Sequence, residues 1–215
     1  MKETTAKKKF MWNMAGSLCN SLSSMLLLII VNRISGESRG GFFALAYSTA
    51  QLLFSVGGFE IRPVQSTDIK NKFTFDQYFT SRMLNCIIML ICMIGYIVVN
   101  GYTGVEALTV FWILGYRMVE AVADVYSGLF QQRERIDISG KEMLMRSGIS
   151  TITFTIILWL TDNLLYAAMT LTLTSLVIML FYDLHMKKYF EPTPVHLEWR
   201  GILGIYNACW PLFVS

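Results

Sequence analysis

Six stretches of this sequence are each long and apolar enough to cross a lipid bilayer. They cover residues of about 10–32, 40–59, 79–99, 106–130, 144–160 and 164–183. A hydrocarbon core about 30 Å thick needs about 20 apolar residues of helix, and backbone in lipid must satisfy its own hydrogen bonds. The runs therefore predict six membrane-spanning helices. A seventh begins near Gly201, and the sequence ends within it at Ser215.

Composition supports a membrane protein and disfavours two other classes. Hydrophobic residues make up 54% of the chain and charged residues 15%, whereas soluble domains carry roughly 25% charged residues. A net charge of +3 gives no reason to expect nucleic acid as a partner. The cysteines show neither CxxC nor Cys/His spacing, so we expect no metal site and no bound cofactor: Cys19, Cys86, Cys92 and Cys209.

Basic residues collect in alternate connections between the six runs. Fifteen lie before the first run or in and beside the even-numbered connections: Lys2, Lys7, Lys8, Lys9, Arg62, Lys70, Lys72, Arg82, Arg133, Arg135, Lys141, Arg146, Lys187, Lys188 and Arg200. The odd-numbered connections hold two, Arg33 and Arg39. Cytoplasmic loops carry the excess of Lys and Arg, so the N-terminus is predicted to be cytoplasmic.

The fourth run contains three charges, Arg117, Glu120 and Asp124. With Glu106 at the outer surface, Arg117 lies about 16 Å deep at 1.5 Å per residue. At roughly 100° per residue the three charges share an arc of about 60°. A charge at mid-bilayer costs at least about 2.5–3.5 kcal/mol. Two interpretations stay open: the stripe lines a hydrated cavity for a polar or anionic substrate, or Arg117 pairs with Glu120 while Asp124 lies near Arg133.

The first run carries a second polar stripe, formed by Asn13, Ser17, Asn20 and Ser24 at helical spacing. Small polar residues often pack membrane helices together, so packing is one interpretation. The other is that this stripe faces the stripe of the fourth run across one shared cavity.

Four stretches carry a resemblance to a known family. They are NMAGSLCNSLSSMLLLIIVNRISG (13–36), GGFFALAYSTAQLLFSVGGFEIRPVQSTD (40–68), RMVEAVADVYSGLFQQRERIDISGKEMLMRSG (117–148) and WPLFVS (210–215). In order and spacing, the chain resembles the bacterial polysaccharide-repeat flippases. These are the O-antigen and capsule translocases of the MATE-like multidrug/oligosaccharidyl-lipid/polysaccharide exporter superfamily.

The resemblance implies an all-α polytopic membrane protein: six transmembrane helices that form one lobe of a two-lobed MATE-like transporter, plus a truncated seventh helix. Residues 1–198 would form the N-terminal six-helix lobe, and residues 199–215 the start of the second lobe, cut within helix seven. The implied function is translocation of undecaprenyl-diphosphate-linked oligosaccharide repeats across the bacterial inner membrane by alternating access. We expect this to require the second lobe. Implied partners are the lipid-linked oligosaccharide, membrane lipids, and a polymerase or glycosyltransferases.

The same resemblance implies roles for individual residues. Arg117 would bind the diphosphate, while Glu120 and Asp124 would tune Arg117 or accept a coupling H⁺ or Na⁺. The sugar would meet Asn13, Ser17 and Asn20, and Arg33 matches the basic residue that closes the first helix. The cytoplasmic motifs are expected to brace helix ends; they comprise Gln65, Asp68, Gln131, Arg135 and Asp137.

Other functions remain as alternatives. One is a multidrug or metabolite exporter of the same fold driven by H⁺ or Na⁺, whose cavity should be rich in carboxylates. A membrane-bound glycosyl- or acyltransferase is disfavoured, because His185 and His196 have no catalytic partner by spacing. A non-functional fragment is a further alternative. We expect a transporter and not an enzyme.

Overall fold

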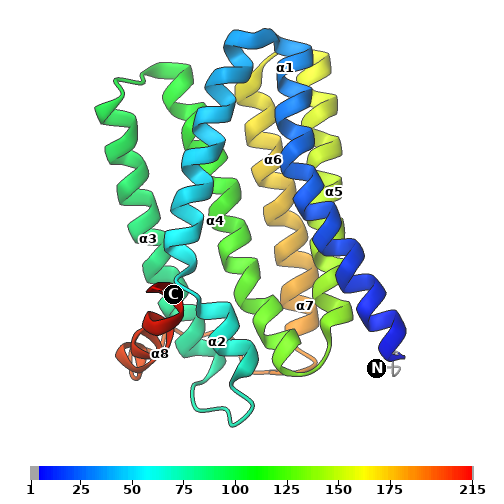
Figure 1. Cartoon of the computed structure of the whole chain (residues 1–215), viewed down its shortest axis with the longest axis vertical. Helices are drawn as coiled ribbons and strands as arrows, with labels where there is room; N and C mark the ends of the chain where they lie inside the picture. The colour runs from blue at the N-terminus through cyan, green and yellow to red at the C-terminus, as the bar shows by residue number, and fades with distance from the viewer. Residues whose placement is uncertain (1–4, 215) are drawn as a thin grey trace.

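The computed structural model describes residues 5–214, and every regular element within them is helical. In chain order these are α1 (Ala6–Gly58), α2 (Ile61–Thr67), α3 (Phe75–Val99), α4 (Gly104–Gln132), α5 (Ile136–Thr161), α6 (Leu164–Ile178), the π-helical η1 (Met179–Asp183), α7 (Leu184–Lys187) and α8 (Ile202–Val214) (Figure 1). The expected all-α membrane fold is confirmed. Lys2 and Ser215 lie outside the described residues.

Four of the described helices are long and apolar enough to cross a membrane: α1, α3, α5 and the continuous run Leu164–Lys187. The charged α4 is not among them, although it lies along the same bundle (Figure 1). The exact number of spans stays a prediction.

α1 contains the first two predicted spans as two legs joined at Gly36. Gly36 has φ 82° and ψ 172°, a backbone region open essentially to glycine alone. The chain reverses there in a tight bend. Residues 33–39, predicted to connect the first two runs, are instead helical on both sides of Gly36. Below the bend the two legs diverge (Figure 1).

The first leg of α1 packs directly on the start of α5. A Cβ on Gly16 would lie 2.2 Å from the carbonyl oxygen of Gly140, and one on Gly140 would lie 2.4 Å from the backbone of Trp12. Small residues at membrane-helix contacts permit such close approach. Because this contact uses the first turns of α5, the helix begins at Ile136 and not near residue 144 as the sequence suggested.

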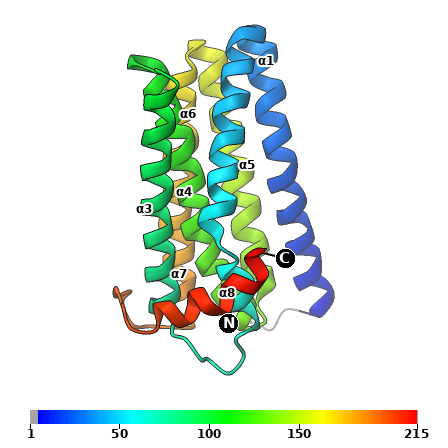
Figure 2. The same cartoon turned by 60° about the vertical axis from the view of Figure 1, so that its left-hand side comes forward.

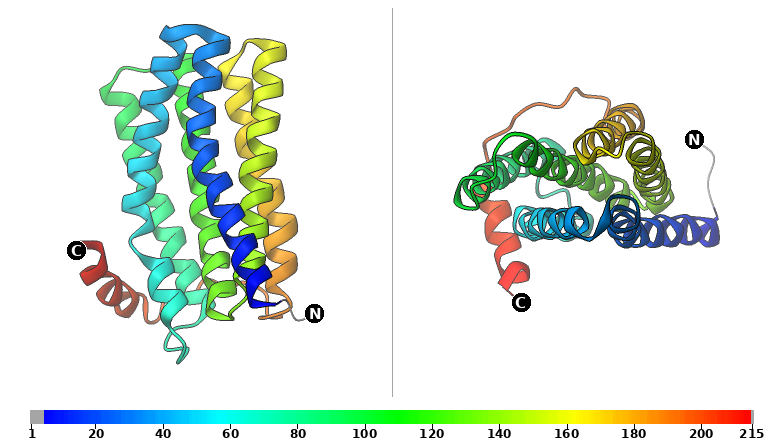
Figure 3. Two further views of the ribbon diagram at one scale, coloured as in Figure 1. Left: turned by 45° about the vertical axis from the view of Figure 1, so that its right-hand side comes forward. Right: turned by 90° about the horizontal axis from the view of Figure 1, so that it is seen from above.

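Seen from above, the two legs of α1 form one row, and α3, α4, α5 and α6 all lie along one side of that row (Figure 3). The apolar core between them includes Leu27, Val31, Phe43 and Phe154, each fully buried. Toward the end of the bundle away from the Gly36 bend, the interior becomes polar.

The connections separate into two ends. The bend of α1 and the α3–α4 and α5–α6 turns lie at one end, here called the bend end. The start of α1, α2, the α4–α5 turn, α7 and α8 (Ile202–Val214) lie at the other, here called the terminal end (Figures 1 and 2). The loops rich in Lys and Arg therefore share one end, as the predicted topology requires. Arg82 and Arg146 do not belong to those loops, because the bundle buries them.

α8 lies across the terminal end and packs against α2 and α3 (Figure 2). Phe59, just after α1, contacts Phe213 and Tyr206 with ring centroids 4.6 and 5.3 Å apart. The segment before α8 is anchored by Glu198, whose carboxylate accepts from Thr74 Oγ1 at 2.8 Å. The assignment of residues 199–215 to a second lobe stays a prediction.

Candidate functional site

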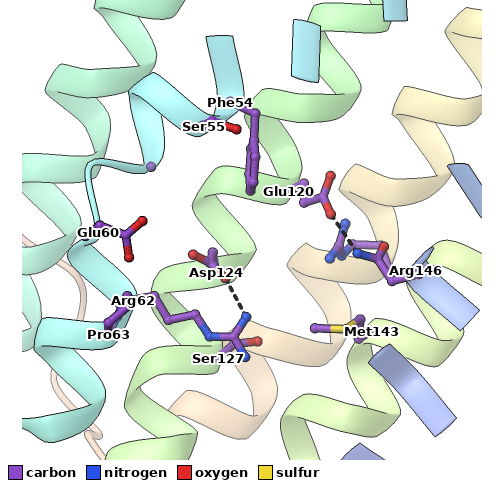
Figure 4. Close-up of a pocket in the computed structure, with 12 residues that line it drawn as sticks. Phe54, Ser55, Glu60, Arg62, Pro63, Glu120, Asp124, Ser127, Met143 and Arg146 are labelled. Atoms are coloured by element: carbon purple, nitrogen blue, oxygen red, sulfur yellow. Dashed lines mark hydrogen bonds and ion pairs between the residues drawn. The ribbon is translucent and has the colours of Figure 1, made fainter. Parts of the chain in front are cut away.

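A polar pocket of about 330 Å³ opens between the diverging legs of α1, the start of α2, and the faces of α4 and α5 (Figure 4). Its charged lining residues are Glu60, Arg62, Glu120, Asp124 and Arg146. Its other lining residues are Asn20, Phe54, Ser55, Gly58, Pro63, Ser127 and Met143. The pocket exists because the bend at Gly36 sends the two legs apart while α4 passes behind both.

Asp124 joins two arginines from different elements. Its carboxylate accepts from Arg62 Nη1 at 2.8 Å and from Arg82 Nη2 at 3.2 Å. Arg82 is fully buried and also donates to the carbonyls of Gly57 and Gly58, at 3.0 Å each. The guanidinium of Arg82 thereby satisfies carbonyls at the end of α1, which have no partner within the helix. Asp124 thus ties α4 to α1, α2 and α3.

Glu120 brings the two predicted stripes together. Asn20 of α1 donates its side-chain amide to Glu120 Oε1 at 3.1 Å, and Glu120 also forms an ion pair with Arg117. The Arg117 guanidinium lies over the Tyr47 ring, 4.4 Å from its centroid. The pairing interpretation of Arg117 is thus the arrangement observed. Arg117 itself does not line the pocket.

The prediction that Asp124 lies near Arg133 is wrong. Arg133 lies beyond the end of α4 and approaches Glu191 at 3.9 Å. Arg62 and Arg82 take its place, and sequence spacing gave no signal for either, because both come from other elements.

A further buried ion pair lies within α5, and one of its members, Arg146, lines the pocket. Arg146 Nε donates to Glu142 Oε1 at 2.5 Å, and both side chains are almost fully buried. This pair was not predicted from the sequence, because Glu142 falls in the predicted connection and Arg146 at its edge. The i,i+4 spacing of a Glu and an Arg was the available signal.

The charges at the pocket are mutually compensated. Asp124 pairs with both Arg62 and Arg82, whereas Glu120 pairs with Arg117 alone and Arg146 with Glu142 alone. Among residues 5–214, Glu60 is the one charged lining residue for which no ion pair forms. The negative charge of Glu60 offsets the second arginine at Asp124, so the lining residues and their ion-pair partners carry no net charge.

Three other predicted site residues lie outside the pocket lining. Asn13 is partly buried beside Gly140, Ser17 is exposed, and Arg33 is exposed near the bend end. Ser24, from the same stripe, accepts from Tyr47 Oη at 3.1 Å and so joins the two legs of α1.

The residues of the predicted cytoplasmic motifs hold the turns at the terminal end. Asp68 accepts from the backbone amides of Lys72 and Phe73 at 2.9 and 3.0 Å and from Tyr78 Oη at 3.1 Å. Arg135 donates twice to Asp137, at 2.8 and 2.9 Å.

Gln65 of the first motif is fully buried and lies against Gly128, where an added Cβ would come within 2.3 Å of its Oε1. Gln131 of the second motif is exposed. Its neighbour Gln132, which the sequence analysis did not single out, donates to the Asp68 carbonyl at 2.5 Å. Within residues 5–214, no group of three His, Cys, Asp or Glu side chains gathers that could hold a metal ion.

A family model described as polysaccharide biosynthesis protein matches residues 6–215. The chain belongs to this family. The family resemblance drawn from the sequence is therefore confirmed. Membership makes the chain a multi-pass membrane protein of polysaccharide biosynthesis and export. No curated protein and no solved structure matches it.

Proposed function

We propose that the chain takes part in moving a lipid-linked oligosaccharide across the bacterial inner membrane, with its N-terminus in the cytoplasm. The carrier would be an undecaprenyl diphosphate. The observation that carries this proposal is the polar pocket inside the helical bundle of a polysaccharide-family protein. Polar groups at membrane depth face protein interiors or water-filled cavities and mark substrate pathways.

The lining suits sugar hydroxyls, which donate and accept hydrogen bonds at once. The carboxylates of Glu120 and Asp124 accept, the amide of Asn20 and the guanidinium of Arg62 donate, and Phe54 offers an apolar ring. Because these charges sum to zero, an uncharged sugar can form hydrogen bonds there without leaving a charge uncompensated.

The diphosphate requires a cation, and Arg62 is placed to supply it, because the one carboxylate of Asp124 is shared between Arg62 and Arg82. Its side chain is 27% exposed and lines the pocket at the terminal end, and a guanidinium binds phosphate oxygens with a two-pronged geometry. In this proposal Arg117 acts through Glu120, which it holds at the pocket wall. A coupling H⁺ or Na⁺ would act at Glu120 or Asp124, and a second lobe would complete the path for alternating access.

Filling the pocket without breaking an ion pair tests the proposal. Ser55 is exposed, lines the pocket and bonds to Gln51 O of its own helix. We expect Ser55→Trp to abolish surface polysaccharide in cells that depend on this chain for export. The matched control is Ser48→Trp, an exposed serine on the same leg with a similar bond to Leu45 O. Full export by Ser55→Trp, at an equal amount in the membrane, would reject the pocket as the substrate site.

A cation exporter is the second candidate, and one observation favours it. Carboxylates outnumber arginines among the lining residues, with Glu60, Glu120 and Asp124 against Arg62 and Arg146. Uptake of a cationic dye by membrane vesicles, blocked by Ser55→Trp, would support this candidate over oligosaccharide export.

A further inference from the structure

A second hollow, of about 610 Å³, lies at the terminal end beside η1 and α7, and shares no residue with the polar pocket. We call it the α7 groove. Its apolar walls include Leu180, Phe181, Leu184, Pro194 and Val195. Its basic residues are His185, Lys187 and Lys188.

Two of these basic side chains are available to a ligand. Lys188 is exposed and forms no ion pair among residues 5–214. His185 is exposed and lies 3.4 Å from Tyr189 Oη. Lys187 differs, because it is buried and its Nζ donates to the Thr193 carbonyl at 2.6 Å. Lys187 therefore holds the loop that forms the outer wall of the groove.

Acidic groups do not neutralise Lys188. Glu191 belongs to the same loop but does not line the groove, and its carboxylate approaches Arg133 at 3.9 Å. Asp183 is fully buried on the inner side of the helix. The groove thus presents positive charge beside apolar walls.

The groove opens where the lipid-facing surface of the bundle ends. Phe181 is 78% exposed, and Val177, one turn earlier on α6, is also exposed. Tyr189, just beyond α7, is 60% exposed, and exposed tyrosines are enriched at the membrane–water interface. An acyl chain lying along Phe181 would bring its headgroup phosphate to Lys188 and His185.

We propose that the α7 groove binds an anionic phospholipid of the adjoining leaflet. Lys188 and His185 contact the headgroup phosphate, and the outer face of α6 contacts an acyl chain. Basic pockets at the cytoplasmic ends of membrane helices bind anionic headgroups. The bound lipid rests on the loop that leads from α7 to α8.

Native mass spectrometry and thermal unfolding of the whole chain in detergent test this proposal. We expect added phosphatidylglycerol to be retained and to raise the melting temperature, while phosphatidylcholine leaves it unchanged. Lys188→Gln should weaken phosphatidylglycerol binding about five-fold, since one lysine near the surface contributes about 1 kcal/mol. The double variant Lys188→Gln, His185→Gln should remove the preference for the anionic lipid.

The control is Lys70→Gln, an exposed lysine at the same end that does not line the groove, and it should bind like the unmodified chain. Inorganic phosphate forms the second arm, because the Lys188 ammonium and the His185 imidazole also suit a free anion. Equal stabilisation by phosphate alone would overturn the lipid assignment. Equal retention of the two lipids, or wild-type binding by the double variant, would overturn the site itself.

Discussion

At the scale of single residues, Asp124 is notable because it forms ion pairs with two arginines from different elements. Its one carboxylate pairs with Arg82, which has no exposed side-chain area, and with Arg62 at the pocket wall. Removing one partner of a buried ion pair leaves a charge in a medium that solvates it poorly, at about 3–5 kcal/mol. We expect Asp124→Asn to lower the unfolding free energy by about 3 kcal/mol in detergent.

A matched carboxylate at the bend end provides the comparison. Asp162 pairs with Arg39 at 3.0 Å, but both side chains are more than half exposed. Exposed pairs contribute about 0–1 kcal/mol, so Asp162→Asn should shift the thermal midpoint little. Equal midpoints for the two variants would contradict the assignment of Asp124 as the bridge between helices.

Arg117 and Glu120 test whether a buried pair also serves the pocket. Arg117→Ala leaves Glu120, which is 6% exposed, with Asn20 as its remaining hydrogen-bond donor among the contacts observed. We expect less protein in the membrane. Adding Glu120→Ala removes the stranded charge and should restore the amount, but not export, because a pocket carboxylate is lost. Immunoblots of membranes and staining of surface polysaccharide measure the two quantities. Export recovered by the double variant would reduce the pair to a structural role.

At the scale of elements, the α1–α5 contact depends on glycine. Gly140→Ala would place a methyl group 2.4 Å from the Trp12 backbone, so the first leg of α1 must shift. Overpacking of this kind costs about 1–3 kcal/mol. Gly148→Ala on the same helix is the control, since its Cβ would meet Cys19 Sγ at an ordinary 3.6 Å. Alanine there should stabilise α5 by about 0.5–1 kcal/mol. Thermal unfolding in detergent separates the two; equal stability would show that α1 and α5 do not touch as described.

The helices were largely predictable, whereas their partners were not. Length and hydropathy located the third run at 79–99, within α3 (Phe75–Val99). The same criterion placed Glu142 and Arg146 in or beside a connection, because it cannot distinguish an exposed loop from a polar helix packed against another helix. Helical spacing put Glu120 and Asn20 on polar stripes, and they do meet. Spacing within one helix gives no information about residues from another helix, so Arg82 was not predicted as a partner of Asp124.

At the scale of the whole molecule, the structure sorts its connections by charge. The α2–α3 and α4–α5 turns at the terminal end carry Lys70, Lys72 and Arg133, while the bend end carries Arg33 and Arg39. Removing the buried Arg82 and Arg146 from the count leaves the bias intact. The membrane potential and the insertion machinery act on loop charge, so this asymmetry predicts which end faces the cytoplasm.

Cysteine labelling of intact cells checks that orientation. The native cysteines are first replaced: Cys19, Cys86, Cys92 and Cys209. Single cysteines then go to exposed positions at each end, Asn100 and Thr161 at the bend end, and Lys70 and Gln131 at the terminal end. A membrane-impermeant maleimide added to intact cells should label positions 100 and 161 alone. After permeabilisation all four should react, which controls for accessibility.

If positions 70 and 131 react in intact cells, the terminal end faces outward. The α7 groove would then lie in the outer leaflet, and the polar pocket between the diverging legs of α1 would have its Arg62 side away from the cytoplasm.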